Sequence, residues 1–272
     1  LSIRESLVIQ QGCNHRCTFC IIPFGRGNNR SFDPFYLIDE VERVVENGVK
    51  EIVLTGVDIS DYGSDFEHRY SMSNLILDIL DKTKLQRLRL SSIDCVEIDE
   101  QFDEVLKDQR VMPHLHLSIQ SGDDMILKRM KRRHNSKDVF EFVEHCKKIR
   151  EDVSFGADII AGFPTETDEM FDNTYRLLKE NEISHLHIFP FSPKNNTPAS
   201  RMPQVSKLII KKRAKNLREL GELILKKVKS KLFLPREVLI EELNLGLAVG
   251  YDQNYIKHKV PLVGVPVGEI IR

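Results

Sequence analysis

The sequence predicts an α/β fold: a partial (β/α)6 barrel, then a basic helix, then a small β-barrel that is cut short. Six short apolar runs alternate with segments of helical periodicity, which is the pattern of a parallel sheet with right-handed crossovers. After the last run, a lysine-rich helical segment leads into short runs with Gly and Pro turns, which are typical of β structure. Six βα units fall short of the eight in a closed barrel, so we expect an open one.

Each element has a local justification. The strands are expected at residues 6–10, 51–54, 86–92, 115–119, 153–160 and 185–191. The helices that follow them are expected at 33–48, 72–82, 99–108, 122–150 and 167–181. In the first helix, Asp33 is a preferred N-cap, Pro34 suits the first helical position, and Gly48 is a typical C-terminal stop.

The chain divides into three parts: residues 1–205 as the barrel, 206–232 as the basic helix and 233–272 as the β domain. The helix is rich in Lys and Arg, Arg213 among them, and its apolar residues recur at helical spacing. Two interpretations stay open for it: a solvated helix that only packs on the barrel, or one that also contacts phosphates. In the last part, Tyr251 and Tyr255 either stack on nucleic-acid bases or pack the domain.

Composition excludes several classes of protein. At 272 residues, with 41% hydrophobic and 30% charged residues, the chain can bury a large core and resembles an ordinary globular protein. The net charge of −1 gives no overall attraction to nucleic acid, so any such surface needs local segregation of charge. We find no signal peptide and no apolar run near the roughly 20 residues of a membrane span, and we expect a cytoplasmic location. Because the chain begins at Leu1, we expect a fragment, natural or excised.

The most informative stretch is CNHRCTFC at residues 13–20, which holds three of the five cysteines. Clustered cysteines suit a reducing compartment and metal binding rather than disulfides. Three thiolates can hold a [4Fe–4S] cluster, which normally takes four cysteines, with one iron left open to an outside ligand. Two alternatives stay open. A structural zinc site would need a second pair of ligands, which Cys95 and Cys146 do not supply, and a redox pair of Cys17 and Cys20 would leave the first cysteine without a role.

The CxxxCxxC spacing, with Phe19 before the last cysteine, resembles the signature of the radical S-adenosylmethionine (SAM) superfamily. Further segments resemble, in the same order, the methylthiotransferases of that superfamily: QQGCNHRCTFCIIPFGRGNNRS, KEIVLTGVDISDYG, HLHLSIQSGDDMILKRMKRRH, DIIAGFPTET and FPFSPKNNTPASRM. The nearest branch is the one that acts on N6-threonylcarbamoyladenosine in tRNA, and the resemblance covers essentially the whole chain. It implies a radical SAM (β/α)6 core followed by a TRAM-like RNA-binding β domain.

The resemblance also implies the cofactors and the reaction. Cys13, Cys17 and Cys20 would each ligate one iron of a [4Fe–4S] cluster, and the amine and carboxylate of SAM would chelate the fourth. An electron from the cluster would split SAM into methionine and a 5′-deoxyadenosyl radical. The implied activity is that of a transferase that adds a methylthio group to C2 of the modified adenosine at position 37, in the anticodon loop of tRNA.

The residues that match the family's SAM-contacting positions follow strand ends, where sites in parallel β/α folds collect. They are Phe19, Thr55, Gly56, Val57, Ser118, Gln120, Ser121, Arg132, Gly162 and Phe189. The resemblance places Phe19 near the adenine, residues 55–57 against the amino group through the backbone, and Arg132 on the carboxylate of SAM. Arg26 and Arg30 match the substrate-facing side of the cysteine loop and are the candidate substrate contacts.

Methylthiotransferases of this kind also have an N-terminal domain with three further cysteines, which hold an auxiliary [4Fe–4S] cluster that carries the sulfur. This chain has no matching motif, so we expect that second cluster on a part of the protein that lies outside it. The expected partners are tRNA and an electron donor such as a flavodoxin or a ferredoxin. The alternatives are the sister branches, which act on isopentenyladenosine in tRNA or on a ribosomal protein, and an RNA-binding protein with a structural metal site.

Overall fold

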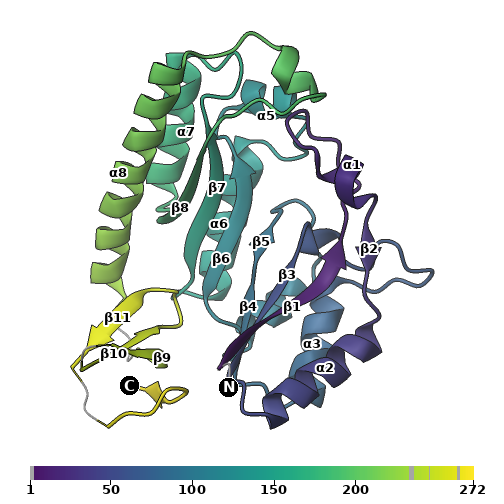
Figure 1. Cartoon of the computed structure of the whole chain (residues 1–272), viewed down its shortest axis with the longest axis vertical. Coiled ribbons are helices and arrows are strands. Elements are labelled where there is room, and N and C mark those ends of the chain that lie inside the picture. Colours follow the sequence, from purple (N-terminus) through teal and green to yellow (C-terminus); the bar gives the residue numbers. More distant parts are fainter. Residues whose placement is uncertain (1–2, 233–235, 245, 262–263) are drawn as a thin grey trace.

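The computed structural model describes residues 3–232, 236–244, 246–261 and 264–272 of the chain (Figure 1). Its strands form an open barrel of parallel neighbours that follow the order of the chain. They are β1 (Arg4–Gln11), β3 (Glu51–Gly56), β4 (Arg87–Leu90), β5 (Ser92–Ile93), β6 (His114–Gln120), β7 (Ser154–Ala161) and β8 (His185–Pro190). The pairings β1–β3, β3–β4, β5–β6, β6–β7 and β7–β8 are all parallel. The predicted fold class is confirmed.

The predicted strand 86–92 is interrupted at Ser91, which separates β4 from β5. The barrel is therefore made of two four-stranded sheets, β2-β1-β3-β4 and β5-β6-β7-β8, where β2 (Arg30–Ser31) is an antiparallel addition to the edge of β1. A single parallel bridge from Leu88 to Val111 continues the wall across the break. Residues that follow β3, β4 and β5, together with residues at the end of β6, line one cavity.

Helices cover the outer face of the barrel. They are α2 (Pro34–Glu46), α3 (Met72–Lys82), α4 (Phe102–Lys107), α5 (Asp124–Met130), α6 (Ser136–Ile149) and α7 (Asp168–Glu180). The helical region expected over 122–150 consists of two helices, α5 and α6. Lys131 adopts a left-handed conformation (φ 59°) that ends α5, and the Asn135 side chain caps the start of α6.

The apolar core lies between these helices and the outward side chains of the strands. Ile9, Leu54, Leu88, Leu117 and Ile159 point outward from successive strands and are almost completely buried. Since side chains alternate along a strand, the residues between them face the barrel interior. That interior is polar, and the difference between the two faces decides where the site can form.

Ion pairs fill the lower end of the interior. Glu51, at the start of β3, is 1% exposed and pairs with Arg87 and Arg89, each at 2.8 Å. The Arg89 guanidinium also donates to the backbone oxygens of Asp252 (2.6 Å) and Gln253 (3.0 Å) near the C-terminus. A buried carboxylate between two guanidinium groups therefore joins the barrel to the C-terminal part of the chain.

The C-terminal part is an antiparallel sheet of order β11-β10-β9-β12 below the barrel (Figure 1). Its strands are β9 (Val238–Asn244), β10 (Leu247–Tyr251), β11 (Lys257–Val260) and β12 (Ile270–Ile271). The expected domain boundary at residue 233 lies outside the described residues. Tyr251 and Tyr255 stack on each other (5.1 Å between ring centroids), and the guanidinium of Arg4 lies over both rings. This favours the packing interpretation of the two tyrosines over the base-stacking one.

The basic helix is α8 (Lys207–Lys231), which packs against β8 and α7. Most of its lysines are exposed, but Arg213 is buried and pairs with Glu166 and Asp168, both at 2.7 Å. Arg213 therefore anchors the helix to the barrel and is not part of a basic surface. Within the described residues, no helix is both long and apolar enough to span a membrane.

Replacing Arg89 by Met is expected to lower the free energy of unfolding by about 3 kcal/mol, because it leaves the buried Glu51 carboxylate with one guanidinium fewer. Urea unfolding followed by circular dichroism measures the change. The matched control is Arg43→Met on the surface of α2, where the pair with Glu40 is exposed and little should change. Equal effects of the two substitutions would contradict the role given to Arg89.

Candidate cofactor-binding site

The cysteine loop begins at the end of β1, where the Gln10 side chain holds it. Gln10 is fully buried, and its Nε2 donates to the Gly12 carbonyl (2.7 Å) and to Asn29 Oδ1 (2.6 Å). Its Oε1 accepts from the backbone N–H of Val57 (3.0 Å) and Asp58 (2.9 Å), after β3. One amide thus joins the start of the loop to the end of the neighbouring strand.

Two glycines allow this close approach. Gly12 has φ +72°, and a Cβ there would lie 1.9 Å from the Asn28 carbonyl oxygen. At Gly56, a Cβ would lie 2.9 Å from both the backbone oxygen and the side-chain oxygen of Gln10. The absence of a side chain at Gly56 thus lets β3 end directly against Gln10.

The far end of the loop is attached to the opposite side of the barrel. Thr18 bonds through its N–H to the Met130 carbonyl (3.1 Å) and through its hydroxyl to the Arg129 carbonyl (2.8 Å), at the end of α5. Phe19 packs edge-on against Phe163 at 6.3 Å, in a small apolar cluster beyond the end of β7. The loop therefore lies across the ends of the strands and is held on both sides.

The three cysteines line one cavity of about 260 Å³. Each sulfur has an N–H donor close by: His15 N for Cys13 (3.3 Å), Ile22 N for Cys20 (3.4 Å) and the Arg132 guanidinium for Cys17 (3.9 Å). Donors of this kind stabilise thiolate ligands.

Burial raises the pKa of Cys13 to about 12 and also raises the pKa of Cys20. These thiols would stay protonated at neutral pH on their own, and a bound metal would keep them deprotonated. Three sulfurs with such donors fit a three-cysteine iron–sulfur cluster.

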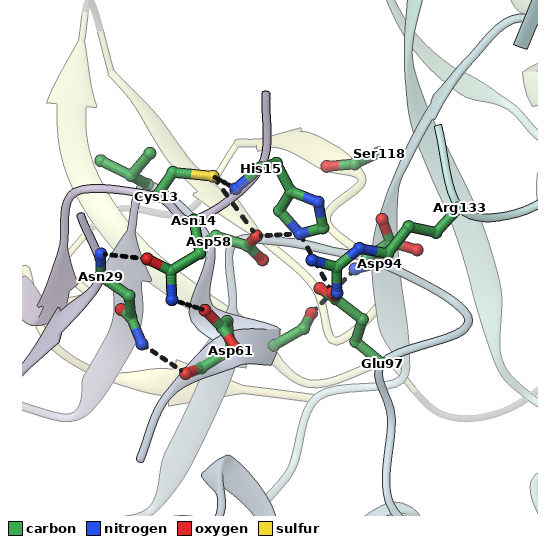
Figure 2. A network of polar contacts seen from close by, with 12 residues as sticks. Cys13, Asn14, His15, Asn29, Asp58, Asp61, Asp94, Glu97, Ser118 and Arg133 are labelled. Atoms are coloured by element: carbon green, nitrogen blue, oxygen red, sulfur yellow. Dashed lines mark hydrogen bonds and ion pairs between the residues drawn. The ribbon is translucent and has the colours of Figure 1, made fainter. Parts of the chain in front are cut away.

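His15, inside the loop, joins it to two carboxylates (Figure 2). Its Nε2 lies 2.9 Å from Asp58, after β3, and 3.0 Å from Glu97, after β5. Hydrogen bonds to Asp58 and then to Glu97 raise the pKa of His15 to about 10. Arg133 pairs with the same Glu97 carboxylate (Figure 2). A cationic imidazole between two acids thus ties the cysteine loop to the ends of two strands.

Arg132 lies beside Cys17, as the prediction of a SAM contact requires, but it already has partners. Its guanidinium pairs with Asp94 at 2.6 Å and donates to the Ser118 carbonyl at 2.8 Å. Burial alone would raise the pKa of Asp94, but the hydrogen bond from His134 and the charge of Arg132 outweigh it and lower that pKa. A ligand carboxylate at this place would have to share the guanidinium with Asp94.

The structure brings most of the predicted site residues into the lining of this one cavity. Those that line it are Cys13, Cys17, Phe19, Cys20, Gly56, Val57, Ser118, Gln120 and Arg132. The others do not: Thr55, Ser121, Gly162, Phe189, Arg26 and Arg30.

Three of the residues outside the lining have other surroundings. Ser121 is buried against Thr174, and a Cβ on Gly162 would lie 2.4 Å from the Ile210 side chain on α8. Arg30 is exposed and donates only weakly, at 3.5 Å, to the Arg26 carbonyl. Their ligand contacts stay predictions.

Sequence reasoning missed the polar residues that complete the cavity. They are His15, Asp58, Ser91, Ser92, Asp94 and Asp158. All except His15 and Asp158 follow closely on the ends of β3, β4 or β5, and that position was the signal that could have found them. Asp158 lies within β7 and not after a strand end, and only its position on the inward face of the strand indicates that it belongs to the cavity.

Comparison with known families agrees with this geometry. A family model of the Radical SAM superfamily matches residues 7–178. The chain belongs to the radical SAM superfamily. That membership agrees with the expected cofactors, a [4Fe–4S] cluster and SAM, and with the three-cysteine cavity described above.

Solved structures have the same fold at low sequence identity. The radical SAM methyltransferase TsrM from Kitasatospora setae aligns with a TM-score of 0.58 at 15% sequence identity. The alignment covers 72% of this chain and 38% of the TsrM chain. The coproporphyrinogen III oxidase HemN from Escherichia coli has a TM-score of 0.54 at 16% identity and covers 89% of this chain and 54% of its own.

Curated relatives are similar over nearly the whole chain. The threonylcarbamoyladenosine tRNA methylthiotransferase MtaB of Rickettsia prowazekii is 46% identical over 99% of this chain and 63% of its own length. The MtaB of Bacillus subtilis is 36% identical over 99% of this chain and 61% of its own. A tRNA-2-methylthio-N6-dimethylallyladenosine synthase of Desulforamulus reducens is 35% identical over 82% of this chain and 49% of its own. The chain thus spans less than two thirds of these relatives.

Cys17→Ala is expected to abolish cluster assembly, since a three-cysteine site loses a required ligand. After anaerobic reconstitution, the unaltered chain should be brown and hold about four irons, and the variant less than about one. Cys95→Ala is the matched control and should bind iron normally, because Cys95 lies outside the cavity lining. A colourless chain that holds one zinc regardless of Cys17 would instead support the structural metal site, for which Cys13, His15 and Asp58 are close enough together.

Proposed function

We propose that the chain is the SAM-cleaving core of a tRNA methylthiotransferase that acts on N6-threonylcarbamoyladenosine. The observation that carries the proposal is the three-cysteine cavity at the strand ends, in a chain that aligns over 99% of its length with enzymes of that name. The product would be the 2-methylthio derivative of the modified adenosine at position 37 of tRNA. A tRNA substrate implies a cytoplasmic location.

Cys13, Cys17 and Cys20 would hold the cluster, which when bound supplies the electron that splits SAM. The chain itself provides the surroundings. Gln10 and His15 fix the loop against the ends of β3 and β5, so the sulfurs stay in place. Phe19 and the apolar cluster around Phe163 close the far side of the loop against water.

The charges around the cavity suit the two ends of an amino acid. Asp58 and Asp94 are carboxylates in its lining, and Arg132 is a cation beside Cys17. The ammonium and carboxylate of the methionine part of SAM would find opposite charges within one small cavity. This is the arrangement expected for a zwitterionic ligand and not for an RNA phosphate.

The sulfur source lies outside this chain in the proposed reaction. The remaining cysteines, Cys95 and Cys146, stand apart, and burial raises the pKa of each to about 12, as for inert core thiols. The auxiliary cluster and the electron donor, a flavodoxin or a ferredoxin, are therefore parts that the complete system adds.

Reconstituted and reduced chain is expected to convert SAM to 5′-deoxyadenosine but to transfer no methylthio group to tRNA. Liquid chromatography with mass spectrometry measures both products. Cys17→Ala should make no 5′-deoxyadenosine, and Cys95→Ala should make the normal amount. Sustained methylthiolation by this chain alone would refute the assignment of the sulfur to another part of the protein.

Cells that lack the gene are expected to lose 2-methylthio-N6-threonylcarbamoyladenosine from tRNA and to accumulate its precursor. Nucleoside analysis of total tRNA by mass spectrometry tests this directly. Loss of the 2-methylthio derivative of isopentenyladenosine instead would assign the chain to the sister branch. An unchanged nucleoside profile would point to the ribosomal-protein branch and contradict a tRNA substrate.

A further inference from the structure

A second polar group faces the barrel interior beside the cysteine cavity. It consists of His116 on β6, Asp158 on β7 and His187 on β8, three neighbouring strands. His116 Nε2 lies 3.0 Å and His187 Nδ1 3.2 Å from the same oxygen of Asp158. Ser92 donates its hydroxyl to the other carboxylate oxygen at 3.0 Å. We call His116, Asp158 and His187 the histidine–aspartate group.

The backbone makes room for this group. A Cβ on Gly156, the neighbour of His116 across the sheet, would lie 2.6 Å from His116 Nδ1. The His116 and His187 rings are 4.4 Å apart, across the strand between them. Although burial opposes ionisation of Asp158, the hydrogen bonds from His116 and His187 hold its pKa well below the usual range, so the carboxylate stays anionic.

His187 is the open member of the group. Its side chain is 65% exposed, against 11% for His116 and 19% for Asp158. Nδ1 is used by Asp158, whereas no described residue hydrogen-bonds to Nε2. The hydrogen bond to Asp158 raises the pKa of His187, which favours the imidazolium form. The largely exposed His187 ring therefore leaves Nε2 available to a ligand, while Nδ1 stays on Asp158.

The place of this donor fits the substrate proposed above. Asp158 lines the cavity that holds the three cysteines, so His187 lies just beyond its edge. C2 and C6 of adenine both adjoin N1, so a base whose C2 faced that cavity would carry its N6 substituent a few ångströms away, along the same edge of the ring. The substituent of threonylcarbamoyladenosine ends in a carboxylate and carries a hydroxyl, whereas dimethylallyl is a hydrocarbon.

We propose that His187, positioned by Asp158 and His116, binds the carboxylate of the N6 substituent through Nε2 and so selects threonylcarbamoyl over hydrocarbon substituents. This inference rests on the proposed function and assigns its specificity. A hydrocarbon there would cover the His187 ring without replacing its hydrogen bonds to water, which disfavours such a substituent.

The test measures binding, so it does not depend on sulfur transfer. Labelled anticodon stem-loops with N6-threonylcarbamoyladenosine, N6-dimethylallyladenosine or plain adenosine at position 37 are titrated with anaerobically reconstituted chain, and fluorescence anisotropy gives Kd. The unaltered chain should bind the threonylcarbamoyl loop roughly tenfold more tightly than the other two, the size expected for one charge-assisted hydrogen bond.

His187→Phe should abolish this preference and leave the Kd of the plain loop within about twofold. His187→Lys should retain part of the preference, because the lysine side chain also supplies an N–H donor to a carboxylate. The matched control is His145→Phe on α6, an exposed histidine that pairs with Asp103 away from the barrel interior, and it should bind like the unaltered chain.

The outcomes separate the two proposals. A preference that survives in His187→Phe, or that His145→Phe also loses, overturns the role of His187 and leaves the proposed function standing. Equal binding of all three RNA stem-loops by the unaltered chain also overturns the role of His187. No binding of any loop contradicts both. If EDTA removes the preference, a metal ion held by the histidine–aspartate group makes the contact and the direct hydrogen bond is wrong.

Discussion

The site depends on one buried amide. Gln10 uses its oxygen for two backbone donors beyond β3 and its nitrogen for two acceptors around the cysteine loop, so every hydrogen-bonding position of the side chain is used. A Glu at that position would lose the donors and bury a charge, and a Leu would leave four polar partners unpaired. The loop, the turn after β3 and Asn29 therefore take their places together.

The two faces of the barrel wall serve different purposes. The outer face supplies the apolar burial that stabilises the fold, through residues such as Leu54 and Ile159. The inner face of a closed (β/α)8 barrel is packed with branched apolar side chains, but here it carries Glu51, Arg89 and Asp158. Glu51 and Arg89 pair with each other, and Arg89 also donates to backbone carbonyls, while two histidines and Ser92 hold Asp158. A polar interior whose groups are satisfied in this way is compatible with a stable fold.

Local sequence patterns predicted most of the helices and strands and the cysteine loop. They failed for residues whose role depends on partners that lie far away in the sequence. The alternation of strands and helices, and the spacing of the three cysteines, are local and were correct. Lys131 ends α5 in a left-handed conformation, and since it is not a glycine, the sequence did not predict a helix end there. Arg213 looks like one more cation on a basic helix, and only the position of Glu166 beneath it shows that it is buried. The role of Asp158 is likewise visible only in the structure, where residues on three other strands hydrogen-bond to it.

Hydrogen bonds from side chains of both parts attach the C-terminal sheet to the barrel. Asn254 donates to the Pro113 and Asp152 carbonyls, and Arg87 and Arg89 donate to carbonyls of the sheet and its turns. The sheet lies at one end of the barrel and the cysteine loop at the other (Figure 1). The separation is roughly 25 Å, the length of an eight-residue parallel strand such as β7. A ligand that contacted both ends would therefore have to span roughly 25 Å, which is longer than a free nucleoside.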